Sequence, residues 1–140
     1  MVYTHRVRVR FSDTDAMGHV NNATFLTYLE EARLHYLSSL PTALVVGGLI
    51  LARAECDYVR PITVDPEPLE VAVWIDAVGR SSFGIGYTIT QRGQVAARGR
   101  SVQVTYDYAA NTSRPLSEDE RQALTAAMQE NPSPEPGAAE

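Results

Sequence analysis

Cysteine is nearly absent from this chain, because Cys56 is the only one among its 140 residues. A single thiol excludes an intrachain disulfide and favours a reducing compartment. Cys56 lies within a predicted strand, where a lone cysteine is usually a small buried hydrophobic residue. No apolar signal-peptide region is visible near the start. The longest apolar run, ALVVGGLILA at residues 43–52, is too short to span a bilayer. We therefore expect a cytoplasmic protein that does not enter a membrane.

An excess of basic residues is also missing. The chain has 12 Lys and Arg against 17 Asp and Glu, for a net charge of −5. This balance disfavours a general binder of nucleic acid or of anionic membranes. The local exception is HRVRVRF (residues 5–11), where three arginines alternate with apolar residues. We interpret this stretch as a strand whose basic face is solvated or protects a sheet edge.

The hydrophobic pattern predicts one long helix and several strands. Apolar residues recur at helical spacing from Asn22 to about Leu40, and Pro41 ends the pattern. Alternating patterns predict strands at residues 3–11, 49–61, 69–79, 82–90 and 95–108, with the polar loop 12–21 before the helix. The last strand places Val102, Val104 and Tyr106 on one side. Four strands in series suggest an antiparallel meander, and the first strand would complete a five-stranded sheet curled around the helix.

The C-terminal part predicts a second helix and a tail. Residues 116–129 read as a helix that Ser117 caps, with acidic residues in its first turn. After Asn131 the chain is rich in proline, so residues 131–140 are expected to be disordered. There is no internal repeat and no linker. We expect a single α+β domain over residues 1–130.

The loop before the long helix concentrates the chemistry-bearing residues. Gly18 permits a sharp turn, and Asn21 is a good N-cap residue with Asn22 at the first helical position. Exposed amides at this helix end would attract an anion or a developing oxyanion. A carboxylate a few residues upstream could then act on a bound carbonyl, which suits acyl transfer. From the residues alone, a plain capped loop remains the alternative. Two aspartates and His19 fall short of a metal site.

The segment FSDTDAMGHVNNATFLTYLEEAR (residues 11–33) resembles the active-site segment of the hotdog-fold acyl-CoA thioesterases, in the branch similar to 4-hydroxybenzoyl-CoA thioesterase. AECDYVRPI (54–62), VGRSSFGIGYTI (78–89) and ARGRSVQVTYD (97–107) resemble the later strands of that family, so the likeness runs from about residue 5 to about residue 125. It implies a sheet wrapped around the helix and subunits joined edge to edge, with active sites at the interface. It also implies hydrolysis of acyl-CoA or of an acyl thioester of acyl carrier protein. A long free edge strand needs a partner, so we expect a homodimer or homotetramer. We expect no cofactor and no metal.

The resemblance assigns roles to individual residues. Asp15 would be the nucleophile or the base for water, and the amide near Asn22 would polarise the thioester carbonyl. Asn22 stands where the hydroxybenzoyl enzyme has a tyrosine, so aliphatic acyl groups are the expected substrates. His19 would orient the loop or protonate the leaving thiolate. Further candidates for substrate and coenzyme A contacts are Asn21, Ala23, Phe25, Arg60, Arg80, Ser81, Ser82 and Arg100.

Three alternatives stay open at this point. Glu30 and Glu31 are rival catalytic carboxylates, because a second hotdog branch places its glutamate on this helix, although Glu31 and His35 also form an ordinary i, i+4 surface pair. The same fold could host a non-catalytic module that binds acyl thioesters. A hotdog dehydratase is the third alternative, and the order of residues in DTDAMGH fits it poorly.

Overall fold

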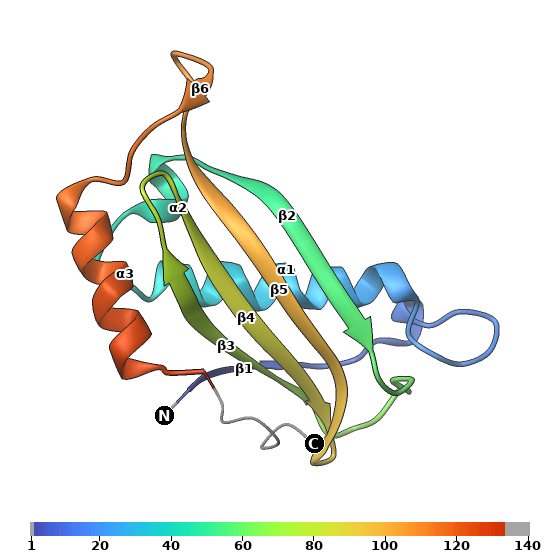
Figure 1. Ribbon diagram of the computed structural model, residues 1–140. Helices are drawn as coiled ribbons and strands as arrows, with labels where there is room; N and C mark the ends of the chain where they lie inside the picture. Colours follow the sequence, from blue (N-terminus) through green and yellow to red (C-terminus); the bar gives the residue numbers. More distant parts are fainter. Residues whose placement is uncertain (1, 134–140) are drawn as a thin grey trace.

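The computed structural model describes residues 2–133, which form a curled sheet with a long helix across one face (Figure 1). The strands are β1 (Tyr3–Val7), β2 (Leu49–Tyr58), β3 (Leu69–Val78), β4 (Ser82–Gln91), β5 (Gln94–Asp107) and the two-residue β6 (Thr112–Ser113). The helices are α1 (Asn22–Ser38), the short α2 (Leu44–Gly47) and α3 (Glu118–Glu130), and Phe11–Asp13 forms a 3-10 turn. The mixed α+β architecture with a wrapped central helix is therefore confirmed.

The order of strands in the sheet corrects one prediction. The order is β1-β3-β4-β5-β2, with β6 paired to β5 outside this path. The strands β3, β4 and β5 form an antiparallel meander, but β2 pairs with β5 and not with β3 (Figure 1). The prediction of a four-strand meander was wrong because residues 59–68 carry the chain across to the opposite edge. As a result β1 and β2 are the two edges of the sheet.

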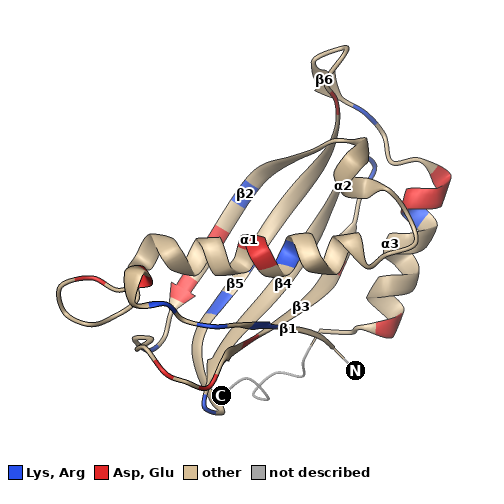
Figure 2. Ribbon diagram, turned by 180° about the vertical axis from the view of Figure 1, so that it is seen from behind, with Lys and Arg blue, Asp and Glu red and all other residues tan. Residues whose placement is uncertain are grey.

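The first strand is shorter than predicted. It ends at Val7, where its partner β3 begins at Leu69, so residues 8–11 have no neighbouring strand to pair with. Val9 is still buried, but Phe11 is 84% exposed in the turn that follows. Arg6, Arg8 and Arg10 are exposed, and Figure 2 shows this basic band along β1 and the segment after it.

The central helix begins where the sequence predicted. Asn21 is the N-cap, and its side-chain oxygen accepts from the Ala23 N–H at 2.8 Å. The helix crosses one face of the sheet, as Figures 1 and 2 show from opposite sides. Its apolar stripe is buried against inward-facing residues of β3 and β4, which confirms the predicted alternation of those strands. The buried members are Phe25, Tyr28, Leu29, Ala32, Tyr36 and Leu37 from α1, Leu69, Val71, Val73 and Ile75 from β3, and Phe83, Ile85, Tyr87 and Ile89 from β4.

In the second half of β5, the face of the strand that is buried is the polar face. Val102, Val104 and Tyr106 share one side, as predicted, and are only half-buried. The opposite side is buried and carries Ser101, Gln103 and Thr105. The Thr105 hydroxyl donates to the Arg114 carbonyl at 2.6 Å. The Gln103 Nε2 donor, by contrast, has no partner among the described residues.

The C-terminal helix α3 starts after Ser117, which caps it together with Glu120 as the sequence predicted. The proline-rich tail was predicted to be disordered, but residues 134–140 lie outside the described part of the chain, so that expectation is untested. The single domain over residues 1–130 also stays a prediction. Among residues 2–133, no helix combines the length and apolar character needed to cross a bilayer.

Candidate active site at the start of the central helix

The loop before α1 holds the Asp15 side chain in a tight turn. Its Oδ1 accepts from the backbone N–H groups of Met17, at 2.9 Å, and of His19, at 3.3 Å. The Asp15 N–H donates to the His19 carbonyl at 2.8 Å, and Gly18 takes a positive φ of 79° that favours glycine. The turn therefore fixes one carboxylate oxygen. Among residues 2–133, no donor bonds the other oxygen, Oδ2, so that oxygen is available for chemistry.

The loop is fastened on both sides to the body of the protein. The Val20 N–H donates to the Ile62 carbonyl at 2.8 Å, and the Asn21 N–H donates to the Asp13 carbonyl at 3.0 Å. The buried Asp13 carboxylate accepts from the Tyr28 hydroxyl at 2.7 Å. Burial and this hydrogen bond to Asp13 raise the pKa of Tyr28. Asp13 is thus a structural anchor of the loop, and Asp15 is the exposed aspartate of the pair.

The helix end offers one amide and not several. The Ala23 N–H is occupied by the Asn21 cap, and the Thr24 N–H donates to the Asn21 carbonyl at 2.9 Å. The Asn22 N–H has no acceptor within the described residues. Ala23 and the Asn21 side chain are therefore used within the cap, and the expected oxyanion donor is reduced to the amide of Asn22.

Asp15 and Asn22 line one open cleft of about 270 Å³ at this end of α1. His19, Phe25 and Arg60 line the same cleft, so the structure brings together five of the residues singled out from the sequence. Phe25 is buried, whereas Asp15, His19, Asn22 and Arg60 are exposed. Arg60 donates to the Val95 carbonyl at 3.1 Å, which holds its guanidinium at the cleft wall.

Tyr58, at the end of β2, completes the cleft and was not singled out from the sequence. Its hydroxyl donates to the Asn22 carbonyl at 2.9 Å, and its ring meets Phe25 edge to face with centroids 4.9 Å apart. Val20, Val59 and Pro61 also line the cleft. The signal that could have indicated Tyr58 is its place two residues before Arg60. Only the tertiary structure, in which the end of β2 lies beside the start of α1, shows that Tyr58 reaches the site.

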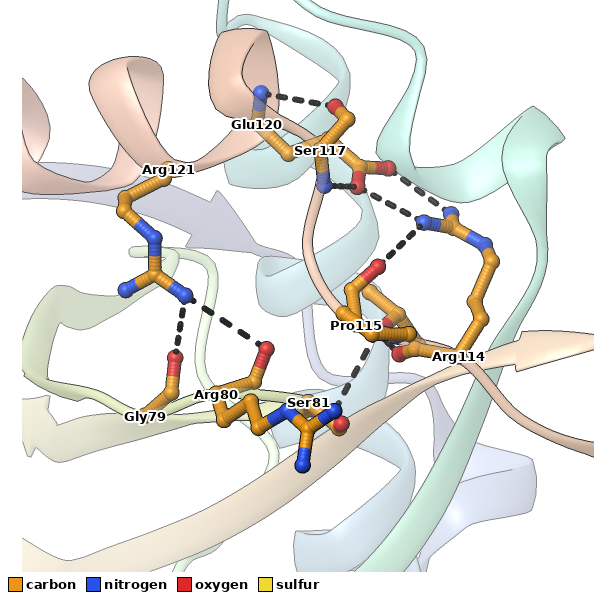
Figure 3. A network of polar contacts seen from close by, with 9 residues as sticks. Gly79, Arg80, Ser81, Arg114, Pro115, Ser117, Glu120 and Arg121 are labelled. Atoms are coloured by element: carbon orange, nitrogen blue, oxygen red, sulfur yellow. Dashed lines mark hydrogen bonds and ion pairs between the residues drawn. The ribbon is translucent and has the colours of Figure 1, made fainter.

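Arg80 and Ser81, in the β3–β4 turn, and Ser82, the first residue of β4, lie at the other end of the sheet. Ser82 pairs with Val104 on β5, whereas Tyr58 beside the cleft pairs with Ala97, which is seven residues or about 23 Å away along the strand. Figure 3 shows this turn bound to the start of α3, where Arg121 donates to the Gly79 carbonyl at 3.0 Å. One chain does not bring these residues to the cleft, so their role with coenzyme A stays a prediction.

Arg100 is also separate from the cleft. Its guanidinium forms a two-point ion pair with Asp76, with distances of 2.7 and 2.9 Å. The side-chain hydrogen bond to Asp76 raises the pKa of Arg100. The pair passes over Gly84, at which any Cβ would overlap both side chains. Its contact with coenzyme A likewise stays a prediction.

The rival carboxylates on α1 have other partners. The Glu31 carboxylate contacts the His5 ring at 3.1 Å, and that ring stacks on His35 with centroids 4.2 Å apart. The expected i, i+4 pair of Glu31 with His35 is therefore wrong, because β1 brings His5 between them. Glu30 lies 3.8 Å from the Arg33 guanidinium on the side of the helix toward β2.

Metal binding was not expected, and the described residues gather no group of three or more His, Cys, Asp or Glu side chains that could hold a metal ion. Cys56 is partly buried and packs against the core. Burial raises the pKa of its thiol, which disfavours the reactive thiolate. The residues with polar or titratable groups that line the cleft include Asp15, His19 and Asn22.

Solved structures of thioesterases share this fold. A thioesterase from Thermus thermophilus, complexed with coenzyme A and zinc, is 38% identical, with a TM-score of 0.81 over 90% of this chain and 93% of that one. A 1,4-dihydroxy-2-naphthoyl-CoA thioesterase from Synechocystis is 27% identical, with a TM-score of 0.78 over 89% and 96% of the two chains. These likenesses confirm the expected hotdog fold.

Curated relatives agree with the structures. A 1,4-dihydroxy-2-naphthoyl-CoA hydrolase of Synechococcus elongatus is 31% identical over 79% of this chain and 85% of that protein. An uncharacterised protein of Bacillus subtilis is 37% identical over 61% of this chain, and the match spans 58% of the length of that relative. The model of the thioesterase-like superfamily matches residues 9–129. The chain therefore belongs to the thioesterase-like superfamily, as the loop and helix motif had indicated.

Proposed function

We propose that this protein hydrolyses acyl-coenzyme A to a free acid and coenzyme A, with Asp15 as the catalytic carboxylate. The observation that carries the proposal is the common cleft of Asp15 and the Asn22 amide. One group is an acceptor with a free oxygen, and the other is a donor at the positive end of a helix. A thioester carbonyl placed between them would have its carbon facing Asp15 and its oxygen facing Asn22.

Two routes are compatible with this geometry. In the first, Asp15 Oδ2 attacks the thioester carbon, the thiolate of coenzyme A leaves, and water hydrolyses the resulting anhydride. In the second, the same oxygen takes a proton from water as that water attacks. The thiolate gains a proton in either route, and His19 at the cleft wall is the candidate to orient the loop or to supply that proton.

The other residues of the cleft support binding rather than chemistry. Tyr58 and Phe25 provide an apolar wall beside the bound carbonyl, and Arg60 provides a cation for a phosphate of coenzyme A. The coenzyme A found with the Thermus relative and the substrate name of the Synechococcus relative support coenzyme A as the carrier. The acyl group could be aliphatic or aromatic. Position 22 carries asparagine where the hydroxybenzoyl enzyme has a tyrosine, and this difference favours aliphatic acyl groups.

The test is thiol release from a panel of aliphatic and aromatic acyl-CoAs, measured for the wild type and for Asp15→Asn. We expect Asp15→Asn to lower kcat by at least about 100-fold, because the amide is neither a base nor a nucleophile at this position. Asp107→Asn, far from the cleft, is the matched control and should keep the wild-type rate. Equal rates for Asp15→Asn and the wild type would exclude the role of Asp15. Tight binding without any turnover would instead favour the non-catalytic module.

A further inference from the structure

A second cavity, of about 170 Å³, lies on the same seam between α1 and β2 as the candidate active site. The candidate cleft is bordered by Phe25 and Tyr58. The second cavity is bordered by Leu26 and Leu29 farther along the helix and by Ala54, four residues before Tyr58 on the strand. It therefore follows the cleft in the direction that an acyl chain would take away from the thioester.

This cavity contains a buried charge with unused donors. The Arg33 side chain is only 9% exposed, and its two polar neighbours, Glu30 and Tyr87, line the same cavity. One guanidinium nitrogen donates to the Tyr87 hydroxyl at 3.2 Å, and another lies 3.8 Å from the Glu30 carboxylate, beyond hydrogen-bond distance. Arginine has five N–H donors and no acceptor. Among residues 2–133, a single hydrogen bond therefore serves a buried cation.

Rigid elements of the sheet hold the partner of this arginine. The Tyr87 hydroxyl on β4 shares a hydrogen bond of 2.5 Å with the Ser101 hydroxyl on β5, and both side chains are buried. Burial raises the pKa of Tyr87, so its hydroxyl stays protonated. It can then donate to Ser101 while it accepts from Arg33. The guanidinium is thus fixed from the sheet side, with its remaining donors available to a group in the cavity.

On the basis of the proposed thioester hydrolysis, we propose that this cavity holds the far end of the acyl group and that Arg33 selects acyl chains ending in an oxygen that accepts hydrogen bonds. Helical side chains lean toward the N-terminus, so the guanidinium lies near the level of Glu30. Eight residues separate Glu30 from Asn22, or about 12 Å along the helix. Chains of roughly six to ten carbons cover that distance. A carboxylate is the strongest candidate, because it can meet a guanidinium at two points.

Glu30 sets how strongly an anion would bind. Its side chain is 62% exposed at the rim of the cavity, and it faces the same guanidinium from 3.8 Å. An incoming carboxylate would compete with Glu30, whereas a terminal hydroxyl would not meet the same repulsion. Removing this charge in Glu30→Gln should therefore favour the carboxylate further.

The experiment measures equilibrium binding of three non-hydrolysable thioethers of coenzyme A by calorimetry. The eight-carbon chains end in a methyl, a hydroxyl or a carboxylate group. We expect the wild type to bind the carboxylate-ended chain at least about tenfold more tightly than the methyl-ended chain, as for hydrogen bonds to a charged group. Arg33→Met should abolish that ratio, and Glu30→Gln should increase it. Arg6→Met, the same change at an exposed arginine on β1, should leave it unchanged.

The outcomes test the acyl-chain selection by Arg33 separately from the proposed thioester hydrolysis. Tighter binding of either oxygen-ended chain, lost in Arg33→Met, supports the inference, and the comparison of hydroxyl with carboxylate shows whether charge contributes. Equal binding of all three chains by the wild type overturns it, as does a preference that survives in Arg33→Met. If Arg33→Met fails to fold, Arg33→Lys and Tyr87→Phe must each reduce the ratio. Because thioethers are not turned over, a failure to hydrolyse any acyl-CoA refutes the proposed function alone.

Discussion

At the scale of single residues, Asn21 decides the geometry of the candidate active site. Its side chain caps α1, and its own backbone N–H donates to the Asp13 carbonyl in the loop. The cap uses the Ala23 amide and leaves the Asn22 amide for a ligand. Asn21 does not itself line the cleft, but its cap determines that the Asn22 amide is the donor left for a ligand.

We predict that Asn21→Ala destabilises the protein by about 1 kcal/mol, because the Ala23 N–H loses its acceptor. Thermal or urea unfolding measures this loss. Asn21→Ser is the matched variant and should restore most of the stability, since serine also caps helices well. No loss of stability in either variant would show that the side-chain cap contributes nothing and that Asn21 acts only through its backbone.

At the scale of elements, the start of α3 is joined to the sheet by a partly buried ion pair. The Arg114 guanidinium meets the Glu120 carboxylate through two hydrogen bonds of 2.8 Å, and the Ser117 N–H donates to the same carboxylate at 2.8 Å (Figure 3). The hydrogen bond from Arg114 lowers the pKa of Glu120 to about 2. Deprotonated Glu120 is therefore strongly preferred in the folded state.

We predict that Glu120→Gln costs about 3 kcal/mol at neutral pH, because a neutral amide leaves Arg114 unpaired. The ordinary pKa of 4.5 applies in the unfolded chain, so this stabilisation is fully present above that pH and is lost as the pH falls toward about 2. The difference in unfolding free energy between wild type and variant should shrink over that range.

Urea unfolding at several pH values measures the effect, and Glu118→Gln is the control. Glu118 is an exposed acid in the same first turn, and its carboxylate contacts only Gln122 at 3.4 Å among the described residues. Its substitution should change stability by less than about 0.5 kcal/mol. A Glu120→Gln deficit of the same size at pH 7 and at pH 3 would contradict the linkage.

At the scale of the whole molecule, the edge strand β2 leaves several apolar side chains exposed. It is ten residues long, and Ile50, Leu51 and Tyr58 on it are 37%, 46% and 46% exposed. A long apolar edge is an aggregation hazard unless another strand covers it. Arg53 and Glu55 form an ion pair of 2.8 Å near the middle of this edge. The self-association expected from the sequence stays a prediction, and β2 is the edge that we propose for it.

We predict that the protein is at least a dimer at micromolar concentration and that Arg53→Glu weakens the assembly. The substitution concentrates acidic residues on an edge that would face its own copy, so like charges would repel. Sedimentation velocity measures the effect. Arg6→Glu makes the same change on β1 and should leave the assembly intact. A monomeric wild type would contradict the prediction and the expected interface site together.

The sequence by itself determined the long helices, the five long strands and the candidate loop, but it did not predict the short α2 or β6. Helical periodicity located α1, Asn21 marked its first turn, and alternation located the strands, because these signals depend on neighbours within a few residues. The likeness of residues 11–33 to the thioesterases singled out Asp15. The same local logic overextended β1 to residue 11, since no local pattern shows where a partner strand begins.

Only the tertiary structure decided which distant residues meet. The crossing of residues 59–68 puts β2 beside β5, and this brings Tyr58 to the start of α1 and Ala54 to the cavity of Arg33. The β3–β4 connection puts Arg80 and Ser81 at the opposite end of the sheet from Tyr58 and the cleft. Sheet order and side-chain contact depend on residues far apart in the chain. A pattern that repeats every two or every 3.6 residues carries no information about them.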